Sequence, residues 1–176
     1  IFCELLPNRA DLIQENYPHA CVIRGDIWEN VDEIVAKARE KHGKTVPRLL
    51  TLSPPCQGMS SNGLGRINNE KKQGKRPEYD PRNRLILPSL DVIEQLSPEF
   101  FLIENAPTMM ETKILIEDKP QKIGTILEKR LGDQYEIYSF QLNFSHYGVP
   151  QSRNRSITIG RYSGSGSHKI QFQAQK

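Results

Sequence analysis

The residues best placed for chemistry follow the ends of two short apolar runs. After residues 49–52 come one serine, two prolines and then Cys56. Proline cannot donate to a β-ladder and restricts the residue before it, so the pair predicts a sharp end to a strand. Glu104 and Asn105 follow the second run, residues 100–103. Because α/β sheets place chemistry at the carboxyl ends of strands, we expect Cys56 and Glu104 to be neighbours.

Each of these residues has a catalytic and a structural interpretation. A thiol in a positive environment ionises near neutral pH and becomes a nucleophile, but a single cysteine such as Cys56 is often an inert, buried small side chain. Glu104 could cap a helix or form a surface ion pair instead of acting as an acid. Gln57 would hold the turn around Cys56, and Asn105 the turn around Glu104, for catalysis or for structure alone.

A third polar set precedes another predicted strand, residues 156–160, and consists of Gln151, Arg153 and Arg155. Arginine carries a permanently ionised fork of donors, so Arg155 could stabilise negative charge that develops during a reaction. Arg155 could instead contact a phosphate or form a structural ion pair. Arg153 could have either of these two roles equally well.

Together, a thiolate, a carboxyl group and a guanidinium suit the alkylation of a cytosine ring. Addition of the Cys56 thiolate to C6 breaks the aromatic conjugation and gives C5 enamine character, so C5 can attack a methyl sulfonium. Covalent catalysis of this kind divides one difficult step into two easier ones. A protonated Glu104 would relieve charge at ring N3, and Arg155 would contact O2, where negative charge develops.

Two acids near the beginning of the chain are candidates for cofactor binding. Glu4 ends a first short strand, and Asp26 follows a second one at residues 20–23. An acid at such a strand end commonly accepts hydrogen bonds from ribose hydroxyls. Asp26 could accept from an adenine amino group while Ile27 packs on the ring. Alone, each acid could equally be a surface residue or a helix cap.

The ordered motifs resemble those of the DNA (cytosine-5) methyltransferase family. Residues 54–57 read Pro-Pro-Cys-Gln, residues 104–106 read Glu-Asn-Ala, and residues 151–155 read Gln-Ser-Arg-Asn-Arg. Each motif is common alone, but the three in this order are a strong signal. The Asp-x-Arg-x-x-Leu spacing of residues 80–85 is also similar to the family. The resemblance covers residues 2–161, about nine-tenths of the chain.

This resemblance implies an enzyme that takes a methyl group from S-adenosylmethionine and flips its target cytosine out of double-stranded DNA. Cys56 would be the nucleophile, Glu104 the N3 partner and Arg155 the O2 contact. Glu4 would bind the cofactor ribose and Asp26 the adenine. Four apolar residues would complete the cofactor side, namely Leu5, Ile27, Pro55 and Leu85. The sequence departs from the usual family pattern at three positions, where Ser53, Met59 and Ala106 replace Gly, Phe and Val.

A long polar segment, residues 58–84, follows Cys56 and lacks helical or strand periodicity. Residues 62–84 contain seven basic and three acidic side chains, a net charge of +4 in a chain whose total is +3. The segment could be a solvated loop, but its position favours a phosphate-facing loop that closes over DNA. The residues expected to contact DNA are Ser60, Arg66, Lys71, Lys72, Lys75, Arg76 and Gln151.

Strands alternate with helices along the chain, which predicts an α/β fold with a mostly parallel sheet. Helices are expected over residues 9–17, 31–42, 85–96 and 122–131. Asn8 would cap the first, and Asn30 with Glu33 would form a capping box for the second. Strands are expected over residues 20–23, 49–52, 100–103, 135–143 and 156–160, the last two as an antiparallel pair. The resemblance implies the Rossmann-like methyltransferase fold.

In that fold the first strand, which is central, and a glycine-rich cofactor loop would precede residue 1, and target recognition would follow residue 161. A sheet without its central strand leaves backbone groups unpaired. We therefore expect residues 1–162 to form a partial catalytic domain and residues 163–176 a linker or loop tail. A complementary chain or segment would supply the rest.

No apolar run approaches the roughly 20 residues that span a bilayer, and no signal peptide is evident, so no membrane partner is expected. Three widely spaced cysteines suggest neither disulfides nor a metal site. These features favour a cytoplasmic bacterial or phage protein, or a nuclear one in a eukaryote. DNA methylation could serve restriction–modification, defence or regulation. Two alternative functions stay open: a catalytically silent DNA-binding module, and an enzyme that methylates RNA such as tRNA.

Overall fold

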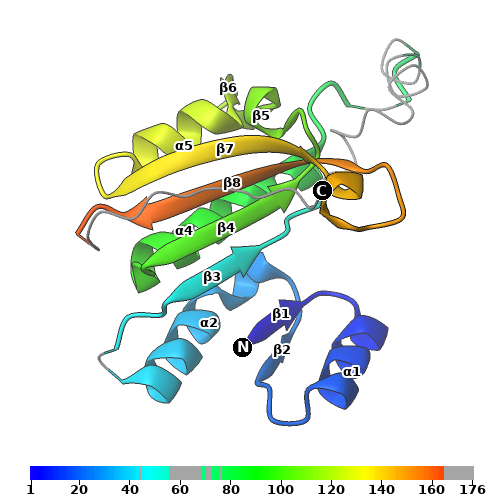
Figure 1. The fold of residues 1–176 in the computed structure, drawn as a ribbon. Coiled ribbons are helices and arrows are strands. Elements are labelled where there is room, and N and C mark those ends of the chain that lie inside the picture. The colour runs from blue at the N-terminus through cyan, green and yellow to red at the C-terminus, as the bar shows by residue number, and fades with distance from the viewer. Residues whose placement is uncertain (44, 56–68, 70–72, 76, 165–176) are drawn as a thin grey trace.

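The structure is a computed structural model that describes residues 1–43, 45–55, 69, 73–75 and 77–164 (Figure 1). The helices in this part of the chain are α1 (Pro7–Asn16), α2 (Ile27–His42), α4 (Ile86–Leu96) and α5 (Ile123–Leu131), with short 3-10 helices η1 (Pro81–Leu85), η2 (Met109–Glu111) and η3 (Phe144–Tyr147). The strands are β1 (Phe2–Glu4), β2 (Val22–Arg24), β3 (Leu49–Leu52), β4 (Phe100–Asn105), β5 (Lys113–Ile116), β6 (Lys119–Lys122), β7 (Tyr135–Asn143) and β8 (Asn154–Tyr162).

The largest sheet has the strand order β3-β4-β8-β7. β3 and β4 are parallel, with Leu52 opposite Ile103. β8 is antiparallel to both β4 and β7. The parallel pair and the antiparallel pair of this sheet confirm the mixed α/β fold and the closing hairpin predicted from the sequence.

β4 continues two residues beyond its predicted end because β8 pairs along its whole length. Glu104 lies opposite Ile157 and Asn105 opposite Ser156. Glu104 and Asn105 are therefore strand residues rather than turn residues, and their side chains point to opposite faces of the sheet.

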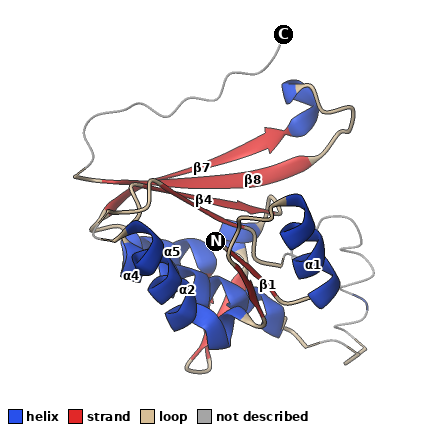
Figure 2. Cartoon of the chain, turned by 90° about the horizontal axis from the view of Figure 1, so that it is seen from below, coloured by secondary structure: helices blue, strands red, loops and turns tan. Residues whose placement is uncertain are grey.

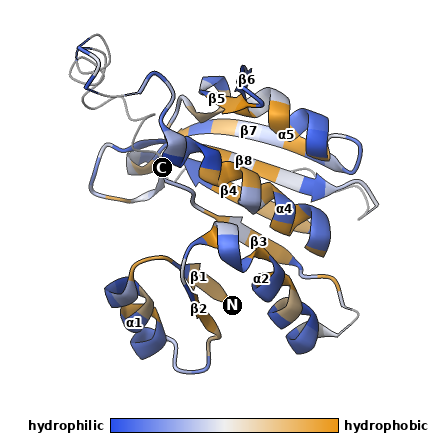
Figure 3. Ribbon diagram, turned by 180° about the vertical axis from the view of Figure 1, so that it is seen from behind, coloured by the Kyte–Doolittle hydropathy of each residue, from blue (hydrophilic) through white to orange (hydrophobic). Residues whose placement is uncertain are grey.

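α4 and α5 lie together on one side of the four-stranded sheet (Figure 2). Phe101 and Ile103 of β4 are fully buried in the core that these helices form with the sheet. The ring of Phe101 packs 5.0 Å from that of Tyr135, centre to centre. Figure 3 shows apolar residues along β3 and β4 beside α4. This packing gives the strands that carry the candidate site a rigid support.

β1 and β2 form a separate parallel pair, with α1 and α2 on its two sides (Figure 2). A small apolar cluster joins this pair to the larger sheet: Ile23 of β2, Ile34 of α2 and Val92 of α4, with Cys3 and Leu50 packed against them. Within the described strands, β1 and β3 are not paired with each other. The sheet is thus interrupted where the expected central strand would lie.

Two helix starts differ from the predictions. α2 begins at Ile27 and is capped by Asp26, whose Oδ1 accepts from the Trp28 backbone N–H at 3.1 Å. The capping box at Asn30 and Glu33 is therefore wrong, because Asn30 lies within the helix and donates to the Asp26 carbonyl at 2.7 Å.

α1 begins at Pro7 after Leu6, so the predicted Asn8 cap is also wrong. Proline fits the first helical turn, where its missing N–H has no helical partner. The same reason explains why Pro88 does not interrupt α4, which begins only two residues earlier at Ile86.

One hairpin, β5–β6, is absent from the sequence predictions. Its turn residues Glu117 and Asp118 adopt left-handed conformations, with φ of 48° and 60°. Tight hairpin turns of this kind usually contain Asn-Gly or Gly, which makes this one hard to recognise. The hairpin buries Ile114 in the main core.

Candidate active site

Glu104 and Arg155 form an ion pair at the carboxyl end of β4. The distance from Arg155 Nε to Glu104 Oε1 is 2.8 Å. The side chains are 18% exposed for Arg155 and 31% for Glu104. The antiparallel pairing of β4 with β8 brings together two residues that lie 51 positions apart in sequence. Arg155 also donates from Nη1 to the carbonyl of Asn154 at 2.8 Å, which fixes the plane of its guanidinium.

Ser53 contributes a second contact to Glu104. Its hydroxyl donates to Glu104 Oε2 at 2.9 Å from the end of β3. The parallel register explains the contact, because Ser53 directly follows Leu52, which lies opposite Ile103. No sequence signal identified Ser53 as a site residue, since the contact depends on how β3 and β4 align.

Asn105 connects the same two strands on the other face of the sheet. Its Nδ2 donates to the carbonyl of Pro54 at 3.0 Å, and its Oδ1 accepts from the Ala106 N–H at 2.8 Å. The residue is 2% exposed. Pro54 lies two positions before Cys56, so this bond anchors the chain segment that leads to the candidate nucleophile.

Seven of the predicted site residues lie outside the described part of the chain: Cys56, Gln57, Ser60, Arg66, Lys71, Lys72 and Arg76. Pro55, the last residue described before Cys56, is exposed. Lys75, Gln151 and Arg153 are exposed.

The segment before α4 contains an internal ion pair. Asp80 is 5% exposed and caps η1. Arg82 donates to it in a two-point contact, from Nε to Oδ1 at 2.9 Å and from Nη2 to Oδ2 at 2.6 Å. This pair fixes the geometry of η1, which ends at the half-buried Leu85. Arg82 therefore balances a buried charge within the protein.

The two candidate cofactor acids lie at the carboxyl ends of neighbouring strands. Glu4 ends β1 and its Oε1 accepts from the Leu6 N–H at 2.9 Å. Asp26 follows β2 and caps α2. Leu5 is exposed, and Ile27 is half-buried at the first position of α2. Asp26 is thus a helix cap, which is the structural role that the sequence allowed for it. In each acid, one carboxylate oxygen accepts a hydrogen bond from the backbone N–H two residues later.

Cys3 precedes Glu4 on β1. Its Sγ lies 3.8 Å from the carbonyl of Gly25, to which it donates. Burial raises the pKa of the Cys3 thiol, and the negative charges of Asp26, Glu4 and Glu33 raise it further. The thiol is therefore kept neutral.

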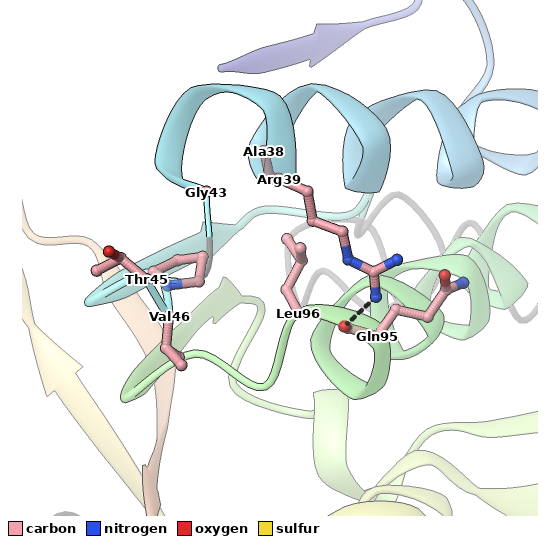
Figure 4. Close-up of a pocket in the computed structure, with 8 residues that line it drawn as sticks. Ala38, Arg39, Gly43, Thr45, Val46, Gln95 and Leu96 are labelled. Atoms are coloured by element: carbon pink, nitrogen blue, oxygen red, sulfur yellow. Dashed lines mark hydrogen bonds between the residues drawn. The ribbon is translucent and has the colours of Figure 1, made fainter.

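Two cavities lie away from the Glu104–Arg155 pair. One, of about 370 Å³, lies between the ends of α2 and α4 and is lined in part by Arg39, Val46 and Leu96 (Figure 4). Arg39 Nη2 donates across it to the Gln95 carbonyl at 3.1 Å. Because Pro47 of its lining precedes β3, this cavity lies at the amino ends of the strands, opposite the candidate site.

The other cavity, of about 560 Å³, lies beside the β7–β8 hairpin. Its lining consists of Pro107, Gln141, Leu142, Asn143, His146, Tyr147 and Asn154. Asn143 and Asn154 lie opposite each other, so their side chains share a face of the sheet, whereas Arg155 points to the other face. Neither cavity contains the Glu104–Arg155 pair, so we locate the candidate site by the contacts among Glu104, Arg155 and Ser53.

Two negative findings hold for the described residues. They contain no group of three or more His, Cys, Asp or Glu side chains that could hold a metal ion. They also contain no helix with the length and apolar character needed to cross a membrane.

Comparisons with known proteins agree on one family. The family model for the C-5 cytosine-specific DNA methylases matches residues 10–176. The type II methyltransferase M1.HgaI of Avibacterium volantium is 36% identical over 155 residues, which are 88% of this chain and 41% of that protein. The type II methyltransferase M1.HphI of Haemophilus parahaemolyticus is 28% identical over 166 residues, 92% of this chain and 39% of that protein. The chain thus spans about two fifths of the length of these relatives.

Solved structures share the fold. The Entamoeba histolytica methyltransferase EhMeth superposes with a TM-score of 0.66 at 19% identity and covers all of this chain and 48% of that one. The S. pombe Dnmt2 methyltransferase gives a TM-score of 0.61 at 20% identity, with 96% of this chain and 42% of that one covered. The sequence motifs, the family model and the relatives therefore lead to one conclusion: this chain belongs to the C-5 cytosine-specific DNA methylase family.

Proposed function

We propose that the protein acts as a DNA cytosine-5 methyltransferase that uses S-adenosylmethionine. The observation that carries the proposal is the Glu104–Arg155 pair, held at 2.8 Å beside the strand exit that leads to Cys56. N3 and O2 are adjacent atoms on one edge of cytosine. A carboxyl group and a guanidinium fixed side by side match that edge, with the carboxyl group at N3 and the guanidinium at O2.

The chain's own residues would carry the proton and charge movements. The thiolate of Cys56 adds to C6 of the flipped base, while Glu104 supplies a proton to N3 and Arg155 stabilises charge at O2. Asn105 holds the Pro54 carbonyl and so anchors the described segment that precedes Cys56. Arg153, exposed on the loop before β8, would contact a phosphate.

The residues at the ends of β1 and β2 fit the cofactor. Each of Glu4 and Asp26 uses one described carboxylate oxygen for its own turn, which leaves an oxygen for a ribose hydroxyl or an adenine amino group. When bound, S-adenosylmethionine supplies an electrophilic methyl group. Leu5, Ile27, Pro55 and Leu85 would provide the apolar contacts around it.

The interruption between β1 and β3 supports a further partner. Both strands have a free edge in the described structure, and strands inside an α/β sheet normally pair on both sides. We infer that a strand from a complementary chain or a flanking segment pairs between them. Hydrogen exchange tests this on the amides of residues 2–4 and 49–52 that are not bonded to β2 or β4. These amides should be protected in the complete assembly and exchange freely in this chain alone. Equal exchange in both samples argues against the inference.

The relatives favour one biological setting. Their names as type II methyltransferases, and their bacterial sources, support a restriction–modification role in a bacterial cytoplasm over a nuclear role. Bisulfite sequencing of DNA from cells that express the protein should show methylcytosine within one short recurring sequence. Methylcytosine scattered without a shared sequence would count against this role.

Trapping on a modified substrate is the direct test of the function. The complete polypeptide is incubated with S-adenosylmethionine and a duplex that contains 5-fluorocytosine, in which the C5 fluorine prevents release of the enzyme. A covalent adduct should form through Cys56 and should be lost in Cys56→Ser. Parallel incubations with tRNA distinguish the RNA alternative. DNA binding without an adduct on either substrate would identify the silent module instead.

A further inference from the structure

The hydroxyl of Ser53 completes a set of two donors around the carboxylate of Glu104. Ser53 Oγ donates to Oε2 at 2.9 Å, while Arg155 Nε lies 2.8 Å from Oε1. Ser53 directly follows β3 and Arg155 lies in β8, and these two strands lie on either side of β4. Both oxygens of Glu104 therefore have a donor before any base arrives.

The two donors differ in what they allow. A guanidinium only donates, so Arg155 interacts best with the ionised carboxylate. A serine hydroxyl both donates and accepts, and its proton rotates to suit its partner. Ser53 can therefore donate to a lone pair of Oε2 whether Glu104 is ionised or protonated, and the acid proton stays available for ring N3. The Ser53 hydroxyl thus keeps its contact with Oε2 both before and after Glu104 passes its proton to the cytosine.

We propose that Ser53 is a positioning residue that keeps Oε2 of Glu104 directed at ring N3 of the target cytosine. This role rests on the proposed function. As sulfur bonds to C6, the displaced ring electrons reach N3, which takes one proton from the Glu104 carboxyl group. The proton returns to the carboxylate once C5 has taken the methyl group, and Ser53 keeps its own proton throughout.

The resemblance to the family does not supply this residue. The usual residue at this position is glycine, which has no side chain to reach Glu104. Ser53 is exposed, so water competes for its hydroxyl until a base enters the site and excludes that water. We therefore expect an effect on the chemical step and only a small effect on folding.

Three substitutions separate the hydroxyl from other properties of the strand. Ser53→Ala removes the hydroxyl, Ser53→Thr keeps it, and Ser53→Gly provides a second variant without it. Thr51→Ala is the matched control, because Thr51 is also exposed but lies opposite Leu102, two positions before Ser53. Methyl transfer to unmodified duplex DNA and adduct formation with 5-fluorocytosine DNA are measured on the complete polypeptide.

In Ser53→Ala, kcat should fall about tenfold, which is the loss expected for one hydrogen bond to a charged group. KM for DNA should change by less than about twofold, because the bond is not made to the substrate. Ser53→Thr should recover most of kcat, and Thr51→Ala should behave like the wild type.

Wild-type kcat in Ser53→Ala and Ser53→Gly overturns the positioning role while leaving the proposed function intact. An equal loss in Thr51→Ala, or no recovery in Ser53→Thr, overturns it as well, because the effect would then not follow the hydroxyl at Ser53. Absence of any adduct or methyl transfer by the wild type on DNA and RNA is a different result: the proposed function fails, and the role of Ser53 falls with it.

Discussion

Asn105 Nδ2 lies 3.0 Å from the carbonyl oxygen of Pro54, and this bond joins the end of β4 to the segment that carries Cys56. The amide is almost completely buried and also caps the Ala106 N–H. One side chain therefore satisfies two backbone groups, one just after β3 and one just after β4. Its removal would leave both without a partner.

Asn105→Ala should lower the free energy of unfolding by about 2–3 kcal/mol, because the half-buried Pro54 carbonyl and the buried Ala106 N–H lose their partners. Urea denaturation measures the change. Asn16→Ala is the control, since exposed Asn16 donates only to the Leu12 carbonyl at the end of α1; it should cost less than about 0.5 kcal/mol. Similar losses in the two variants would contradict the structural role of Asn105.

Arg155→Lys should slow adduct formation on 5-fluorocytosine DNA by about 100-fold or more, because an ammonium cannot reproduce the planar fork that contacts Glu104 and the base. Arg153→Lys, two residues earlier and exposed, should leave the rate of the chemical step nearly unchanged and weaken DNA binding slightly. Equal slowing by both substitutions would assign Arg155 to phosphate binding rather than to the site.

Gly160→Ala should destabilise the protein by about 3 kcal/mol, because an added Cβ would lie 1.9 Å from Cε1 of Phe101. Phe101→Leu removes the ring and should be destabilising alone. Combined with Gly160→Ala, it should cost less than the sum of the two single changes. Strict additivity in a double-mutant cycle would show that the ring does not limit this position.

Stability should fall in acid in a way that depends on Glu136. The hydrogen bond from Arg161 lowers the pKa of Glu136, and that from Tyr138 lowers it further. A carboxylate with a lowered pKa contributes its stability above the ordinary value of about 4.3, and that contribution is lost as the pH falls through the value in the folded state. Glu136→Gln should therefore flatten the decline in melting temperature measured between neutral pH and about pH 3. An unchanged decline would mean that other carboxylates account for it.

Asp118→Gly should stabilise the protein by about 1 kcal/mol, because glycine adopts the left-handed conformation of Asp118 (φ 60°) without strain. Asp133→Gly is the matched control at an exposed turn position without positive φ, and it should not stabilise. Thermal unfolding of both variants checks the prediction. A lower melting temperature for Asp118→Gly would show that the Asp side chain itself supports the hairpin.

The sequence predicted those elements whose local pattern agrees with their tertiary environment. The apolar run at residues 49–52 is β3 as predicted, and α5 ends at Leu131, before Gly132. Alternation of apolar and polar residues along 135–143 identified β7. In α5 the apolar residues that favour the helix are also the ones that the core buries, so local preference and packing give the same answer. β3 is only partly covered, with Leu50 and Leu52 half-buried and Leu49 exposed.

Elsewhere the local signals competed. Asp26 and Asn30 are both good helix caps, and the choice between them depends on where β2 ends, which is fixed by its pairing with β1. β6 contains Pro120 and charged residues that disfavour strands, and only its pairing with β5 stabilises it.

The contact of Ser53 with Glu104 could not be predicted either. It requires the register of β3 against β4, which no short stretch of sequence contains.

The interruption of the sheet has a mechanical consequence. Glu4 and Asp26 belong to the β1–β2 pair and the helix start that follows it, whereas Glu104 lies in the larger sheet. Packing between α2 and α4 therefore helps to set the distance between the proposed methyl donor and its acceptor, together with any strand that pairs between β1 and β3. Ile34 and Val92 meet at that joint. Val92→Ala should therefore increase the distance over which the methyl group is transferred, although Val92 would contact neither reactant. Catalytic efficiency would then depend on an apolar side chain remote from the reacting atoms.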